Sequence, residues 1–75
     1  MYNVSDKIFE MVQTDRSLRL KIALNLGVVE QSVLNAVDRR SDNLTKYGAI
    51  KAIKEHTGLN ESDILVEEVE NNNVG

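Results

Sequence analysis

The chain has 75 residues and a mass of 8.4 kDa, which suffices for one domain and excludes two separate hydrophobic cores. Apolar residues make up 41% and charged residues 28%, and this composition, at a formal net charge of −3, predicts a folded chain rather than a disordered one. The absence of Cys excludes disulfides, a thiolate nucleophile and Cys-ligated zinc, and it is typical of an intracellular protein.

The first predicted helix begins near Ser5. Ser5 stands at an N-cap position, and Val4, the residue before the cap, is placed to pack against Phe9 within the helix. Apolar residues then recur at helical spacing as far as Val12, so one side of this helix is expected to face the core.

A second helix is predicted from about Arg16 to Leu26, and Gly27 is predicted to end it. A glycine suits that position because it adopts the left-handed conformation that turns the chain sharply after a helix. The inward face of this helix is expected to consist of Leu18, Ile22, Ala23 and Leu26.

Three further helices are predicted in the rest of the chain. The third runs from about Val29 to Asp38, the fourth follows a polar loop over residues 39–43 with Asp42 or Asn43 as its cap and stops at Gly58, and the fifth starts at Asn60. The residues expected to face inward are Val29, Val33, Ala36 and Val37 on the third helix, Leu44, Tyr47, Ile50 and Ile53 on the fourth, and Ile64 and Leu65 on the fifth.

Together these elements predict an all-α fold. We expect a compact five-helix domain over residues 1–66, followed by an acidic, Asn-rich C-terminal tail over residues 67–75 that is frayed. The sequence leaves one alternative open for this end, a short strand over residues 65–69 that pairs with another chain.

The charge is distributed unevenly along the chain. Residues 39–54 hold five of the nine Lys and Arg residues and one acid, whereas residues 55–75 hold six acids and no Lys or Arg. A basic segment can steer toward phosphates even when the total charge is negative, and the alternative is a solvated helix face.

Residues 19–36 have the pattern of two helices joined by a sharp turn. Ala23, four residues before Gly27, is small enough to let two helices cross closely. Val33, six residues after Gly27, can wedge into the angle between the two helices. The shared apolar floor is expected to be Ile22, Leu26 and Val28. This segment resembles a helix-turn-helix unit, and the chain from about residue 5 to residue 65 is similar to the lambda-repressor and Cro type of DNA-binding domain.

The resemblance implies sequence-specific binding of double-stranded DNA by a small transcriptional regulator of bacterial or phage type. In that family the second helix of the pair lies in the major groove with its early residues on base edges. The base-reading candidates are then Glu30, Gln31, Ser32 and Asn35. The phosphate-binding candidates are Arg19, Arg39, Arg40, Ser41, Asn43 and Lys46. Gln and Asn can bind adenine through N6 and N7, whereas Glu can only accept, for example from cytosine N4.

This sequence departs from the family pattern in two respects. Leu18 and Arg19 stand where the family usually has a hydroxyl residue and then Gln, so Arg19 is expected to replace the usual backbone contact. Glu30 and Asp38 add negative charge to the surface that would meet DNA, and this predicts weak or narrowly sequence-dependent binding.

The sequence does not predict an enzyme. His56 is the sole His, and the chain has no Gly-rich phosphate loop, so we expect no metal, cofactor or small-molecule substrate. No apolar run approaches the about 20 residues of a membrane-spanning helix and no signal peptide is visible, so we expect no membrane partner and a cytoplasmic location.

An alternative function is a helical protein-interaction module, or an antitoxin-like partner protein, that keeps this fold with weak or no DNA binding. Its binding surface would be Leu34, Val37 and the acidic end. The sequence also leaves a symmetric homodimer open, which would set two recognition helices about 34 Å apart to match a palindromic site.

Overall fold

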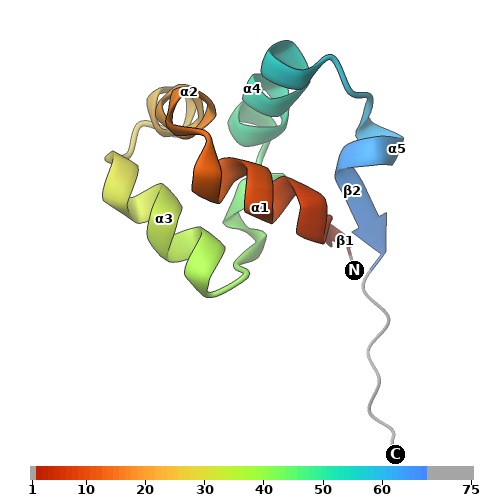
Figure 1. The fold of residues 1–75 in the computed structure, drawn as a ribbon, viewed down its shortest axis with the longest axis horizontal. Coiled ribbons are helices and arrows are strands. Elements are labelled where there is room, and N and C mark those ends of the chain that lie inside the picture. The colour runs from red at the N-terminus through yellow and green to blue at the C-terminus, as the bar shows by residue number, and fades with distance from the viewer. Residues whose placement is uncertain (1, 68–75) are drawn as a thin grey trace, which may run out of the picture.

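The structure, a computed structural model, describes residues 2–67 (Figure 1). Its elements follow the chain in the order β1 (Tyr2–Val4), α1 (Asp6–Thr14), α2 (Arg16–Leu26), α3 (Glu30–Asp38), the 3₁₀-helix η1 (Asp42–Thr45), α4 (Tyr47–Thr57), α5 (Glu61–Ile64) and β2 (Leu65–Glu67). Helices account for most of these residues, which confirms the predicted all-α class. The predicted tail lies outside the described residues except for Glu67, which belongs to β2.

Side chains at the helix starts explain why the helices begin where they do. Ser5 Oγ accepts from the backbone N–H of Ile8 at 3.4 Å, and Asn60 Oδ1 accepts from that of Asp63 at 3.1 Å, as the sequence predicts for both caps. Gly27 and Gly58 end α2 and α4 in the left-handed conformation, with φ of 71° and 75°. The predicted bounds of the first, second, third and fifth helices are close to the observed ones, whereas the single helix predicted from Asp42 or Asn43 is divided into η1 and α4.

A single hydrophobic core lies between the helices. Its buried members are Val4, Ile8, Phe9, Val12, Leu18, Ile22, Ala23, Val33, Ala36, Val37, Leu44, Ala49, Ile50, Ala52, Ile53 and Ile64. Ala23 and Val33 are both buried in it, at the two positions where the sequence predicts a close helix crossing and a wedge. The core therefore fixes α3 against α2.

Three residues predicted to face the core are exposed instead. Val29 is 69% exposed, because α3 begins at Glu30 and Val29 is the extended N-cap residue before it, outside the helical periodicity. Tyr47 is 80% exposed, because Lys46 is extended and separates η1 from α4, so Leu44 and Tyr47 do not share one helix face. Val28, predicted to lie on the core floor, is also exposed.

A two-stranded antiparallel sheet joins the two ends of the described chain. Tyr2 is paired with Glu67 and Val4 with Leu65, so the short C-terminal strand that the sequence leaves open forms over Leu65–Glu67 and pairs with β1 of the same chain. The backbone N–H of Ser5 donates to the carbonyl oxygen of Ile64 at 2.8 Å and continues this connection. No pattern in the sequence predicts β1.

Helix α4 packs closely on α2. A Cβ at Gly48 would lie 2.9 Å from the backbone oxygen of Asn25, and the Asn25 side-chain Nδ2 donates to the Gly48 carbonyl oxygen at 3.1 Å. A glycine is therefore required sterically at this crossing. Among residues 2–67, none of the helices combines the length and apolar character needed to span a membrane.

Candidate nucleic-acid interface

The α2–α3 turn sets the direction of α3. The backbone N–H of Gly27 donates to the Leu24 carbonyl, and that of Val28 donates to the Ala23 carbonyl, which closes the C-terminal end of α2 in a Schellman-like arrangement. Val33 lies on the buried side of α3, and the polar side chains of Gln31, Ser32 and Asn35 are exposed to solvent.

Several predicted site residues line one hollow of about 210 Å³ beside α3. Its lining is Ser32, Asn35, Ala36, Arg39, Ser41 and Asn43. An adjoining smaller hollow is lined by Ser32, Asn43 and Lys46 together with apolar residues that include Val28. Hydroxyl, amide, guanidinium and ammonium groups thus meet on one side of α3, and such groups donate hydrogen bonds to phosphate oxygens.

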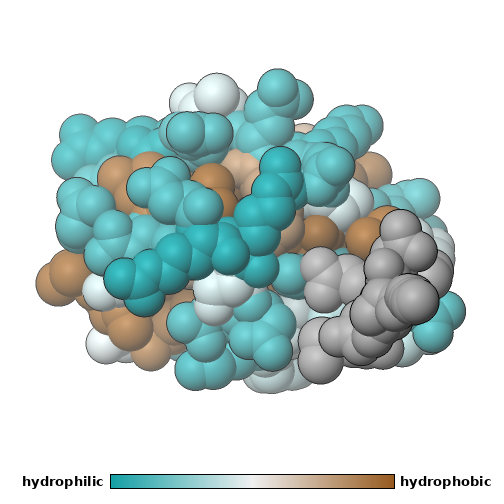
Figure 2. Space-filling model, turned by 90° about the horizontal axis from the view of Figure 1, so that it is seen from below, coloured by the Kyte–Doolittle hydropathy of each residue, from teal (hydrophilic) through white to brown (hydrophobic). Residues whose placement is uncertain are grey.

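The loop after α3 is held beside the helix by its own hydrogen bonds. The backbone N–H of Ser41 donates to the Ala36 carbonyl at 2.8 Å, and the Ser41 hydroxyl accepts from the N–H of Asn43 at 3.1 Å. These contacts return the chain toward α3 and start η1, so the positions of Ser41 and Asn43 follow from local chemistry. Figure 2 views the molecule from below, the side on which α3 lies in Figure 1, and hydrophilic side chains cover much of this face.

Gln31 and Asn35 form a hydrogen-bonded pair on the exposed face of α3. Gln31 Nε2 donates to Asn35 Oδ1 at 3.1 Å, as the spacing of four residues on a helix permits. The two amides are therefore oriented relative to each other before any partner arrives, which lowers the entropy that binding must remove.

Arg19 and Glu30 are occupied within the fold. Arg19 Nε donates to Glu30 Oε2 at 3.0 Å, and Arg19 Nη1 donates to the carbonyl oxygens of Val12 and Gln13 at 3.1 and 2.6 Å. Arg16 Nε lies 3.4 Å from the same Glu30 oxygen. The side chain of Arg19 is only 12% exposed, so this guanidinium joins α1, α2 and α3 and is not a free phosphate ligand.

The Glu30 cluster also changes the electrostatic expectation for α3. Two guanidinium groups surround one carboxylate, so the cluster of Arg16, Arg19 and Glu30 carries a net charge of +1. Glu30 therefore does not present an unbalanced negative charge at the start of α3. Arg16, whose side chain is 72% exposed, is the cation that the sequence analysis missed here; its position in the first turn of α2, directly after the Asp15 cap, was the available signal.

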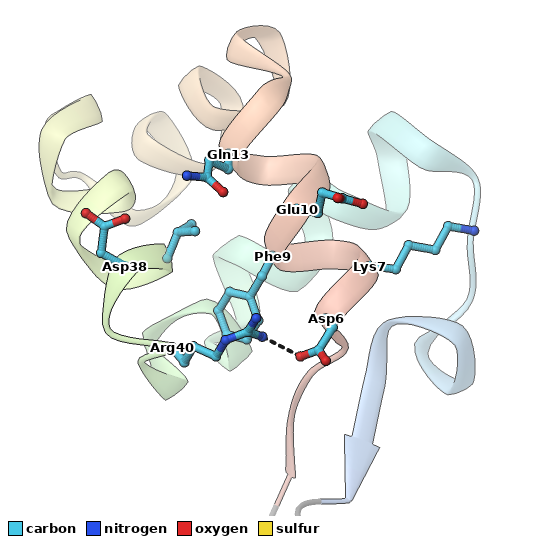
Figure 3. A pocket seen from close by; sticks show the side chains of 8 residues that line it. Asp6, Lys7, Phe9, Glu10, Gln13, Asp38 and Arg40 are labelled. Atoms are coloured by element: carbon cyan, nitrogen blue, oxygen red, sulfur yellow. Dashed lines mark hydrogen bonds and ion pairs between the residues drawn. The ribbon is translucent and has the colours of Figure 1, made fainter.

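Arg40 lies apart from the other predicted phosphate ligands. Its guanidinium carbon is 5.0 Å from the centre of the Phe9 ring, and its Nη1 forms an ion pair with Asp6 on α1 (Figure 3). Its backbone has φ of 50°, and its carbonyl oxygen accepts from the buried Asn3 side chain. This residue turns the chain and connects α1 to the loop, so its guanidinium lies outside the hollow beside α3.

Asp38 likewise belongs to a different hollow. A space of about 440 Å³ separates the C-terminal end of α3 from α1, and Asp38, Arg40, Phe9 and Glu10 are among its lining residues (Figure 3). The five cations of residues 39–54 do not lie on one surface either, because Lys51 and Lys54 line a hollow on the outer side of α4. Arg39 and Lys46 are the members of that segment that lie beside α3.

A pair of hydrogen bonds to the Asp15 carboxylate fixes the start of α2. Asp15 Oδ1 accepts from the backbone N–H of Leu18 at 3.2 Å, and Asp15 Oδ2 lies 2.9 Å from His56 Nε2 on α4. The hydrogen bond from His56 and then that from Leu18 stabilise the carboxylate and lower the pKa of Asp15 from its ordinary value of 3.8. This pair connects α4 to the helix that carries the α2–α3 turn.

Comparison of the chain with protein-family models, curated proteins and solved structures found no match. Within residues 2–67, no three His, Asp or Glu side chains come together as a set that could hold a metal ion. The features that bear on function are therefore the polar hollow beside α3, the oriented amide pair and the two cations next to them.

Proposed function

We propose that this protein binds double-stranded DNA in a sequence-specific manner, as a small regulator of the helix-turn-helix class similar to lambda repressor and Cro. One observation carries the proposal: Ser32, Asn35, Arg39, Ser41 and Asn43 line a single hollow beside an exposed helix that follows a Gly27 turn. The mechanism is occupancy of a site on DNA rather than catalysis.

The side chains divide into two roles. Arg39 and Lys46, with the loop residues Ser41 and Asn43, contact phosphates and set the register of the protein on the duplex. Gln31, together with Ser32 and Asn35, contacts base edges in the major groove. Glu30 and Arg19 orient α3 through their mutual ion pair instead of contacting DNA.

A salt titration tests the proposal directly. Fluorescence anisotropy of a labelled mixed-sequence duplex, followed between about 50 and 200 mM salt, should give an affinity that falls steeply as salt rises. Arg39→Ala should weaken binding to every sequence and reduce the slope of log K against log salt by about 1. Absence of any salt-dependent binding at the lowest salt would refute the proposal.

Lys51→Ala is the matched control for Arg39→Ala. Both variants lower the net charge by the same amount, but Lys51 lines the hollow on the outer side of α4 with Tyr47 and Glu61. Lys51→Ala should therefore leave the slope of log K against log salt nearly unchanged. Equal effects of the two variants would mean that total charge, and not the α3 face, controls binding.

The alternative of a protein-interaction module has two of its predicted surface residues covered by the fold. Val37 is buried in the core and Leu34 is half-buried, so these two residues do not form an exposed apolar patch. The acidic end lies mostly outside the described residues. This alternative would be favoured only by a folded protein that shows no affinity for duplex DNA at low salt.

A further inference from the structure

We infer that copies of this protein associate head to tail, with the outward face of α2 on one copy packed against the sheet of β1 and β2 on the next. The α2 surface consists of Leu20, Lys21 and Leu24. The sheet surface consists of Tyr2 and Glu67. This contact needs no DNA, so it goes beyond the proposed function and is measured separately from it.

The exposed apolar side chains of this protein are concentrated at two places. Among residues 2–67, seven large apolar side chains are exposed, and six of them belong either to α2 and the turn after it or to the two strands. Figure 1 shows α2 and its turn at one end of the long axis and the strands toward the other. Exposed apolar groups at opposite ends of one molecule suit a contact between different copies. The six residues are Leu20, Leu24, Val28, Val29, Tyr2 and Val66.

The residues of the α2 surface lie on one face of the helix. Leu20 is four residues before Leu24, and Lys21 is three residues before it, so both are neighbours of Leu24 on the helix surface. The core side of the same helix is formed by the buried Leu18 and Ile22. Leu24 is 80% exposed and Leu20 is 44% exposed. The fold therefore leaves two leucines and one cation side by side in solvent.

Tyr2 and Glu67 are neighbours on the sheet surface. They are directly opposite each other in the antiparallel register, which places their side chains next to each other on one face of the sheet. Both side chains are exposed, Tyr2 at 60%. A tyrosine ring supplies a large apolar area and is enriched in contacts between proteins. Tyr2 of one copy can therefore cover the leucines of the next while Glu67 reaches Lys21.

The two surfaces come from segments of opposite charge. Helix α2 contains three cations and no acid, whereas residues 61–67 contain three acids and no cation. Lys21 is the α2 cation outside the Glu30 cluster, and among residues 2–67 neither Lys21 nor Glu67 takes part in an ion pair. This complementarity favours a second copy as the occupant of each surface. It opposes a two-fold contact of α2 with α2, which would bring two Lys21 side chains together.

A contact between two different surfaces has a geometric consequence. Every pair of copies leaves one α2 surface and one sheet surface unused, so the association continues into longer chains unless the rotation between copies closes a ring. Two leucines and one tyrosine form a smaller contact than the about 1,200 Å² of a stable interface, so we expect association at about 0.1 to 1 mM protein.

Sedimentation velocity in the absence of DNA tests this contact. Between about 10 µM and 1 mM, the weight-average mass of the wild type should rise above the mass of two chains. Leu24→Ser on the α2 surface and Tyr2→Ser on the sheet surface should each lower the association constant about tenfold. An equimolar mixture of these two variants should form pairs and nothing longer, because each variant contributes one intact surface.

Charge reversal tests which surfaces meet. Lys21→Glu and Glu67→Lys should each weaken association about tenfold, and the double variant should recover most of it, because the exchanged charges attract again. Tyr47→Ser is the matched control for Leu24→Ser. Tyr47 is also 80% exposed but lines the hollow on the outer side of α4, so this variant should associate like the wild type. Circular dichroism verifies that each surface variant is folded.

Three outcomes would overturn the inference. The first is a wild type that stays monomeric up to about 1 mM, and the second is a mass that stops at two chains and is not restored by mixing Leu24→Ser with Tyr2→Ser. The third is a loss of association in Tyr47→Ser as large as in Leu24→Ser. None of these results changes the salt titration with duplex DNA, so the proposed function stands or fails on its own experiment.

Discussion

Replacing Gly48 by Ala should destabilise the protein, although the same change in a helix ordinarily stabilises it. Gly48 lies inside α4, where helix propensity alone favours Ala by about 1 kcal/mol. A Cβ at this position, however, would lie 2.9 Å from the backbone oxygen of Asn25 on α2, closer than real Cβ contacts come. Overpacking of this kind costs about 1 to 3 kcal/mol, because the two helices must move apart.

The overpacking cost less the propensity gain leaves a net loss of up to about 2 kcal/mol, which corresponds to a Tm lower by up to roughly 8 to 16 °C for a domain of this size. Thermal and urea unfolding followed by circular dichroism measures it. Since the obstacle is a backbone atom, Asn25→Ala should not rescue Gly48→Ala. A Tm for Gly48→Ala above that of the wild type would refute the close approach of α2 and α4.

Three further predictions concern the elements around α3. Arg19→Ala should lower the free energy of unfolding by about 1 to 3 kcal/mol, because the 12% exposed guanidinium binds Glu30 and two backbone carbonyls. Arg16→Ala, at a 72% exposed side chain, should change the free energy of unfolding by less than about 0.5 kcal/mol. Equal urea midpoints for the two variants would contradict this difference. Val29→Ser should raise the free energy of unfolding by about 1 kcal/mol through the new N-cap, and an unchanged or lower Tm would show that position 29 is not a cap. The pKa of Asp15 is lower in the folded state than its ordinary 3.8, so the stabilisation by its carboxylate should be complete above about pH 5 and be lost as pH falls through the lowered pKa. The urea midpoint of Asp15→Asn should therefore vary less with pH in this range than that of the wild type.

The sequence predicts the elements whose causes are local. The caps at Ser5 and Asn60 and the left-handed Gly27 depend on residues within one helical turn, and all three are found where the pattern indicates. Tyr47 is predicted wrongly because the spacing from Leu44 assumes an unbroken helix, and only the extended Lys46 reveals the interruption.

Contacts between distant segments account for the remaining differences. Arg40 follows Arg39 directly and is equally basic, yet its guanidinium lies on Phe9 because α1 packs beside that loop. The strand at Tyr2–Val4 exists because its partner comes from the other end of the unit, and no pattern within three residues predicts such a pairing. Arg19 appears in sequence as a free cation, whereas its surroundings are supplied by α1 and α3.

The pairing of β1 with β2 determines how this unit would be attached to anything else. Both strands lie at one edge, on the opposite side of the ribbon from the α2–α3 turn (Figure 1). A fluorophore, affinity handle or second domain linked before Tyr2 or after Glu67 would therefore leave from the same place. Immobilising the protein through either strand should keep the surface beside α3 accessible to a long, rigid molecule.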